Sequence, residues 1–596
     1  MIYGSPPSLT KRFFWILFAG ASTIPLVAQV DEPGRNASDA GSNMPAKVSA
    51  RAEPVPAIEP VVVISPEETA LMELVRSLLP LERHFRDLAA KVIARAYQDR
   101  GYRPLWSPDQ LHPGFHRELA EELKRHAFPG LMALDPEGLV PQIKGTPVDA
   151  RDLAHTIAFC DTALLIRMGA VPFSKIWAEW DLGDTPGSDD RAVESILGDL
   201  VVATATQPFV MQTAMDKLAP KNWIYRELLK AYPGAREAVL KYTGIPAIPD
   251  PEQIGPGKPS LPYIGAPAIA AHLIDRGYLQ MAPEQAPLMT VMTPELTGAL
   301  IAFQRDYGLD PDGIFGQSSW SCLNTNAADR YRSVTINLHR ARLIPNDMGD
   351  RYLLVNLPGA ELYAFNANDF HVLTMRVVHG RADKETHLTK IFRDRMQEVV
   401  FGPYWNVPPS IAVKELLPMA QEDWGYLSRN NYEIVNSFHP DDGQVNRLSP
   451  ETFDGVAKGQ LLIRQRPGPT NALGYVKFLF PNTYNIYMHD TPTKENFARS
   501  KRDASHGCIR VSEPDRLGEW VLGPAGWSLD KIRNSMANDV NKGVAVPGGI
   551  NVYITYFTTF PRPTSDGRIL LTPARDVYGL DAVDARTYKE VIPWSE

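Results

Sequence analysis

The chain has 596 residues, enough for about three or four domains of roughly 150 residues each. Hydrophobic residues make up 44% and charged residues 22%, which is typical of packed globular domains and excludes a mainly disordered chain or a membrane bundle. The net charge of −8 argues against a nucleic-acid-binding protein, and the 3 cysteines exclude a disulfide-rich scaffold or a Cys-rich metal site.

The first thirty residues have the pattern of an export signal. Two basic residues precede the apolar run Phe13–Ala21. We expect either a signal peptide cleaved near Ala28 or an uncleaved membrane anchor over Phe13–Val30, within residues 1–30. Residues 31–65 are rich in Pro, Ala, Ser and Gly, which predicts a disordered linker. The body of the protein is therefore expected outside the cytoplasm, either free or tethered.

Helical spacing begins near Glu67, where apolar residues recur every three or four positions. Similar patterns continue to the proline-rich break at Pro246–Pro262. We predict an all-α scaffold domain over residues 66–262, without visible chemistry of its own.

A smaller helical unit is predicted at residues 263–326. Its helix leads into an acidic glycine loop that could bind calcium or form a tight turn. Calcium binding fails because position 308 is glycine and no Glu stands at the twelfth position. A turn is consistent, because Gly313 permits positive φ and Asp312 can bond the backbone. The run FQRDYGLDPDGIFG resembles the three-helix peptidoglycan-binding repeat of cell-wall enzymes, although a helical hairpin without a ligand is the alternative.

After about residue 330 the signals become those of β-strands. Short runs of alternating apolar residues are separated by Pro, Gly and Asn turns, which indicates a mostly β sandwich or barrel at residues 333–558. Residues 409–468 interrupt these runs with helical spacing and are predicted to form an inserted helical lid. Residues 559–596 are expected to be a C-terminal tail.

The chemistry-bearing residues lie in two short segments of this β region. Met488-His489-Asp490 closes a strand, and the run Ser505-His506-Gly507-Cys508-Ile509-Arg510 follows. A nucleophilic thiol needs an imidazole to accept its proton, amide N–H groups for an oxyanion, and a third group that orients the imidazole, here the Asp490 carbonyl or side chain. The alternatives are an inert buried Cys508 or a metal site, but zinc would want three or four protein ligands.

His489, fifteen intervening residues and then Ser505-His506-Gly507-Cys508 resemble the signature of the L,D-transpeptidase catalytic domain. Three further runs, GYRPLW, FGPYWNVPPSIA and RQRPGPTNALGYVKFLFPN, resemble the large multidomain members of Gram-negative bacteria. The resemblance implies a multidomain α+β protein, with a β sandwich or barrel-like catalytic domain, a helical lid insertion, an all-α scaffold and a three-helix peptidoglycan-binding domain. His387 departs from the family pattern, where proline is common, and receives no role.

The resemblance implies a cysteine acyltransferase that acts on peptidoglycan stem peptides. Cys508 would attack the carbonyl of the third residue of a tetrapeptide stem and release D-alanine. An amine of a second stem would then resolve the thioester, forming a third-to-third cross-link in the periplasm without a cofactor or metal. The implied catalytic residues are Cys508 as nucleophile, His489 as proton donor and acceptor, Asp490 as its orienting group, and His506 and Gly507 in the oxyanion loop. The implied substrate-binding residues are Ser505, Arg510, Tyr487 and Trp405.

Two alternatives remain open at this stage. The same acyl-enzyme could hydrolyse a cross-link or attach a protein to the wall, or the chain could be a catalytically silent wall-binding scaffold. Cys160 and Cys322 fall in different predicted domains and are expected to be buried free thiols. We expect peptidoglycan stems and glycan as partners and no nucleic acid, and the pattern is silent on protein partners.

Overall fold

The structure is a computed structural model that describes residues 65–172, 210–241, 245–307, 309–438, 445–499, 501–563, 567 and 569–589. The predicted export segment and all but the last residue of the predicted linker lie outside these residues. Among the described helices, none is both long and apolar enough to cross a membrane.

The described residues before residue 242 are helical, as the spacing of apolar residues predicts. Ser65 begins the first helix by accepting a hydrogen bond from the Glu68 N–H, with Pro66 in the first turn, and Asp149 caps the buried helix α5 in the same way. The helices are α1 (Pro66–Leu78), α2 (Arg86–Asp99), α3 (Phe115–Arg125), α4 (Pro136–Leu139), the 3₁₀ turn Val140–Gln142, α5 (Ala150–Met168), α8 (Met211–Leu218) and α9 (Trp223–Lys241).

The buried carboxylate of Asp152 on α5 explains the GYRPLW run. One oxygen accepts hydrogen bonds from the Leu105 N–H at 3.0 Å and the Tyr97 hydroxyl at 2.5 Å, and the other accepts from the Trp106 N–H at 2.9 Å. The Trp106 indole donates to Thr156 Oγ1 at 2.9 Å. These main-chain N–H groups are buried and cannot bond to water, so their hydrogen bonds to Asp152 fix the loop to α5.

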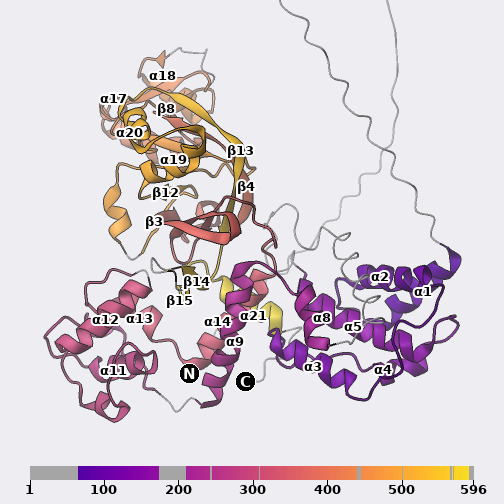
Figure 1. The fold of residues 1–596 in the computed structure, drawn as a ribbon. Coiled ribbons are helices and arrows are strands. Elements are labelled where there is room, and N and C mark those ends of the chain that lie inside the picture. The colour runs from indigo at the N-terminus through magenta and orange to yellow at the C-terminus, as the bar shows by residue number, and fades with distance from the viewer. Residues whose placement is uncertain are drawn as a thin grey trace, which may run out of the picture. The chain divides into compact units, whose positions relative to one another are not determined.

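A second helical group has a hydrophobic core of its own, and α11, α12 and α13 lie together in it (Figure 1). Gln304 of α12 accepts from the Gly313 N–H at 2.9 Å, and Asp312 accepts from the Ile314 N–H at 2.9 Å, so the acidic glycine loop is a tight turn as predicted. Ile248 packs into this core, so the chain joins the group before the predicted boundary at residue 262. The elements are α10 (Pro251–Ile254), α11 (Ala266–Asp275), the 3₁₀ helix Pro283–Leu288, α12 (Pro294–Asp306) and α13 (Gln317–Leu323).

The β region forms a nine-stranded sheet in the order β11-β3-β12-β10-β9-β4-β13-β1-β2. An additional pairing of β2 with β3 joins the two ends, so eight strands close into a barrel and β11 extends from β3. Of the predicted sandwich or barrel, the barrel is therefore found. The strands are β1 (Tyr352–Asn356), β2 (Glu361–Asn366), β3 (Phe370–Gly380), β4 (Phe392–Phe401), β9 (Val476–Leu479), β10 (Met488–His489), β11 (Asp503–Ser505), β12 (Ile509–Val511) and β13 (Lys542–Thr555).

Short helices connect these strands. They are the 3₁₀ turns Ala367–Asp369, Glu385–His387, Lys494–Ala498 and Gly523–Ala525, and the helices α19 (Pro514–Leu522) and α20 (Leu529–Ala537).

The insertion between β4 and β9 combines helices with a four-stranded antiparallel sheet, in the order β5-β8-β6-β7, around a separate core. Its first part is helical, as predicted, but its later part contains short strands as well as a helix, and its role as a lid stays a prediction. Strands of two to four residues are too short to show a two-residue period. The elements are β5 (Trp405–Asn406), α15 (Pro409–Ile411), a π-turn (Ala412–Leu416), α16 (Leu417–Glu422), α17 (Tyr426–Arg429), β6 (Tyr432–Val435), β7 (Val445–Asn446), α18 (Pro450–Ala457) and β8 (Leu462–Gln465).

The described residues of the predicted C-terminal tail instead pack on the protein. They form the hairpin β14 (Thr559–Pro563) and β15 (Ile569–Pro573), and then α21 (Leu580–Lys589). Helix α21 lies against α14 (Ala327–Ala341), which runs beside α9 (Figure 1). Arg340 of α14 and Asp584 of α21 are fully buried and form an ion pair of 2.7 Å, with Asp581 also 2.7 Å from the guanidinium.

This buried pair yields a stability prediction. Asp584→Asn should lower the local free energy of unfolding by about 3 kcal/mol, because it leaves the buried Arg340 charge with one carboxylate fewer. Hydrogen exchange of the α14 amides measures this loss. Asp454→Asn, in an exposed pair with Lys458, should leave the same amides unchanged. Equal hydrogen exchange in the two variants would contradict the conclusion that packing of α21 stabilises α14.

Candidate active site

Parallel pairing of β10 and β12 brings the two sequence motifs together. Met488 pairs with Ile509 and His489 with Arg510, and the Ile509 N–H donates to the Tyr487 carbonyl at 3.0 Å. Met488 and Ile509 are fully buried in the hydrophobic core. Since side chains alternate along strands, the residues on the other face are the ones that carry chemistry: Tyr487, His489, Cys508 and Arg510.

The Cys508 thiol is half-buried and donates to the Asn485 carbonyl, with 3.7 Å between Sγ and oxygen. Burial raises the pKa of Cys508 to about 11, although hydrogen bonds from Tyr487 to the sulfur and the charge of Arg510 act in the opposite direction. The resting thiol is therefore protonated at neutral pH.

His489 is only 5% exposed, and its Nδ1 lies 2.5 Å from the Asp490 carbonyl oxygen. A carbonyl can only accept, so Nδ1 carries the proton and Nε2 keeps its lone pair. Burial and then the Arg510 charge lower the pKa of His489 to about 3, although the bond to the Asp490 carbonyl raises it. The resting site thus holds a neutral base and a neutral thiol instead of an ion pair.

Asp490 orients His489 through its main chain and not through its carboxylate. That carboxylate accepts from the Tyr475 N–H at 3.0 Å and pairs with Lys494. Gly474 has a φ of +60°, and a β-carbon there would collide with the Asp490 carboxylate. Of the two groups left open by the sequence, the carbonyl is the one that lies within hydrogen-bond distance of the ring.

The loop that precedes Cys508 is fixed by the hydroxyl group of Ser505. Ser505 Oγ accepts from the Gly507 N–H at 3.1 Å and donates to the Cys508 carbonyl at 2.6 Å, and Thr389 donates to the Gly507 carbonyl at 2.7 Å. Gly507 has a φ of +118°, which other residues rarely adopt. Ser505 is 2% exposed and its hydroxyl is engaged within the loop, and its predicted substrate contact stays a prediction.

His506 contacts the insertion, and Trp405 is part of it. His506 Nε2 lies 2.8 Å from Arg381 and 2.9 Å from Glu415 of the π-turn. The Trp405 ring packs near Tyr432 inside the insertion, with 6.1 Å between ring centroids. The predicted substrate contact of Trp405 remains a prediction.

Arg510 is the residue predicted to bind a substrate carboxylate. One of its terminal nitrogens donates to Thr493 Oγ1 at 3.3 Å. Its Nε is buried and has no hydrogen-bond partner within the described residues. Because this donor is buried, the predicted contact of Arg510 with a carboxylate of a bound peptide stays a prediction.

Sequence reasoning missed Arg381, Thr389 and Glu415, and it gave His387 no role. The His387 ring lies edge-on to His506, with 4.7 Å between centroids, and its Nδ1 is 2.8 Å from Asp383. The only available signal was a dense cluster of charged residues after β3, which by itself resembles an ordinary surface loop.

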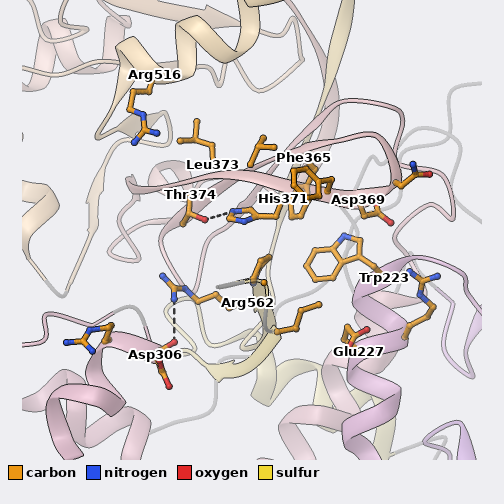
Figure 2. A pocket seen from close by; sticks show the side chains of 18 residues that line it. Trp223, Glu227, Asp306, Phe365, Asp369, His371, Leu373, Thr374, Arg516 and Arg562 are labelled. Carbon is orange, nitrogen blue, oxygen red and sulfur yellow. Dashed lines mark hydrogen bonds between the residues drawn. The ribbon is translucent and has the colours of Figure 1, made fainter. Parts of the chain in front are cut away.

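The remaining candidate features lie away from this site. Cys160 and Cys322 are buried free thiols, as predicted. Within the described ranges, no group of three His, Cys, Asp or Glu side chains is arranged to hold a metal ion. A cavity of about 1060 Å³, lined by residues such as Trp223, His371 and Arg562, contains none of the predicted site residues (Figure 2).

Comparisons with known proteins agree with the geometry. Residues 350–540 match the family model of the L,D-transpeptidase catalytic domain, and residues 91–231 match that of the scaffold domain. A Haemophilus influenzae protein with the provisional name L,D-transpeptidase is 30% identical over 253 residues. This match covers 42% of the chain and 48% of the relative, so the chain spans about half the length of this curated relative.

A solved structure was also matched, a fused zinc-dependent amidase/peptidase/peptidoglycan-binding domain protein from Clostridium acetobutylicum. It is 12% identical, with 50% of this chain and 99% of that chain covered and a TM-score of 0.14. A score this low carries no argument about the fold.

The protonated resting thiol predicts how Cys508 reacts with pH. Its alkylation rate should rise about tenfold per pH unit from neutral pH to about pH 10, because the thiolate fraction follows the raised pKa. Arg510→Met should slow the reaction at each pH, and Arg510→Lys should restore it in part. Peptide mapping assigns the label, and a plateau near neutral pH would reveal a resting ion pair instead.

The close approach of Gly474 to Asp490 gives a second prediction. Gly474→Ala should lower the thermal unfolding midpoint more than Gly459→Ala, which also has positive φ but no neighbour within 4 Å. Both variants share the backbone strain, of about 1–2 kcal/mol, so the difference reports the collision with Asp490. Equal midpoints would mean that the Asp490 carboxylate moves freely.

Proposed function

The chain carries an L,D-transpeptidase catalytic domain at residues 350–540, and on this premise we propose that it cross-links peptidoglycan stems. The observation that carries the proposal is the β10–β12 pairing, which puts a neutral imidazole with a free Nε2 on the same face as a half-buried thiol. A scaffold that only binds the wall has no need of a base with its tautomer fixed in this way.

In the first step Cys508 attacks the carbonyl carbon of the third residue of a tetrapeptide stem. His489 Nε2 accepts the thiol proton as the carbon–sulfur bond forms, and the carbonyl oxygen becomes an oxyanion. The Cys508 N–H, which makes no hydrogen bond in the described part of the chain, is a donor for that oxygen. The C–N bond then breaks, and His489 returns the proton to the departing D-alanine amine.

In the second step the amine of another stem attacks the thioester. His489 accepts a proton from this amine, the carbon–sulfur bond breaks, and the proton passes to the Cys508 sulfur. The products are a third-to-third cross-link and the original protonated thiol, so no cofactor or energy source is required.

The neutral resting pair fits an enzyme whose thiol is activated only by its substrate. The pKa values of Cys508 and His489, about 11 and about 3, disfavour proton transfer in the empty site. A substrate carboxylate near Arg510 would raise the pKa of His489 and that of Cys508 together, because the guanidinium lowers both, so it would not by itself create an ion pair. Proton transfer would therefore accompany attack on the carbonyl.

The family and the predicted export segment support a periplasmic location, with peptidoglycan stems and glycan as partners. We also propose that the helical group at 263–326 binds wall material, because its turn resembles that of the peptidoglycan-binding repeat. Membrane anchoring through residues 1–30 belongs to the same proposal.

A direct test incubates the chain with disaccharide-tetrapeptides and analyses the products by mass. We expect dimers that have lost one D-alanine. His489→Ala should lower their rate of formation by roughly 10²–10⁴, the usual effect of a positioned acid–base group. His112→Ala, at a partly exposed site on the helical scaffold, is the matched control.

Other products would favour the alternative functions. Tripeptide monomers alone would indicate hydrolysis, and a stem attached to an added protein would indicate wall anchoring. Unchanged substrate together with unmodified Cys508 in folded protein would contradict the proposal.

A further inference from the structure

One nitrogen of His506 is approached by two groups with opposite requirements. Its Nε2 lies 2.8 Å from Arg381 Nη2 and 2.9 Å from Glu415 Oε1. A guanidinium N–H can only donate, so it needs the Nε2 lone pair, whereas a carboxylate can only accept, so it needs a proton on Nε2. The two contacts are therefore favoured by different protonation states of the same ring.

The charged groups around His506 reinforce this competition. Arg381 and the edge-on His387 ring face it from the segment after β3, and Glu415 faces it from the insertion. Asp383 is held by His387 and also lies 3.5 Å from the Arg381 guanidinium. Burial lowers the pKa of His506, and Arg381 and His387 add to this effect, while Glu415 opposes it. Protonation of His506 thus strengthens its attraction to Glu415 and turns its contact with Arg381 into repulsion.

Glu415 connects the insertion to the nucleophile loop. Its neighbours Ala412 and Leu416 are buried in the insertion's core, so the Glu415 carboxylate moves together with the insertion. On the other side, His506 directly precedes Gly507 and Cys508. The π-helical turn at Ala412–Leu416 is a rare backbone form that is often found at functional sites.

We propose that Glu415 is a positioning residue that holds the insertion closed over Cys508 when His506 Nε2 carries a proton, and releases it when Nε2 accepts from Arg381. The proposal rests on the proposed function only in taking Cys508 as the nucleophile. Its consequence is a reaction site whose accessibility changes with pH, independently of the ionisation of the thiol.

The test compares two maleimides that share one reactive group, N-ethylmaleimide and a maleimide with a polyethylene glycol chain. At a given pH both reagents react with the same Cys508 thiolate. The ratio of the bulky to the small labelling rate is therefore independent of thiol ionisation and measures the access of the bulky reagent to Cys508. In the full chain this ratio should rise about fivefold from about pH 5 to about pH 8, the effect of losing one partly exposed ion pair.

Glu415→Gln should remove the pH dependence of the ratio, because an amide can donate to the lone pair as well as accept from the N–H. Arg381→Met should keep the ratio low at about pH 8, since the competing donor is gone. Glu422→Gln, an exposed residue of the same insertion, should behave as the wild type.

A wild-type ratio that does not change with pH, or a Glu415→Gln variant that keeps the wild-type change, would overturn the proposal. Labelling requires no transpeptidation. A chain that makes no cross-links but shows the pH-dependent ratio would therefore refute the proposed function and leave the role of Glu415 intact.

Discussion

The pairing of two very short strands, β10 and β12, is the constraint on which the candidate site depends. The Ile509 N–H bonds to the Tyr487 carbonyl, and the burial of Met488 and Ile509 fixes which face each neighbouring side chain occupies. A slip of one residue would exchange the faces and move His489 into the core. The closed barrel holds β10 between β9 and β12 and so prevents such a slip.

Burial then determines the protonation states within that frame. It raises the pKa of Cys508 and lowers that of His489, so both groups are neutral at rest. The carbonyl of Asp490 fixes the tautomer, and the Asp490 carboxylate is occupied by Tyr475 and Lys494. The main chain therefore orients the base, which explains why the identity of residue 490 alone does not reveal its role.

The sequence predicts the residues that carry chemistry better than the residues that position them. Cys508 and His489 lie in compact motifs, and the alternation of apolar residues indicates strands. Arg381 and Glu415, however, are 125 and 91 residues away from His506, and no local pattern links them to it. Ser505 looks polar and available in the sequence, but folding commits its hydroxyl to the loop. The sheet of the insertion and the packing of α21 were missed because short strands and a single terminal helix carry little periodic signal.

The insertion begins and ends at neighbouring points of the barrel. Phe401 at the end of β4 pairs with Val476 at the start of β9, and the intervening chain has its own core. A tight turn could join these two strands as an ordinary hairpin without changing any other barrel pairing. The insertion can therefore be replaced by evolution or protein engineering while the strands that hold the thiol and imidazole stay the same.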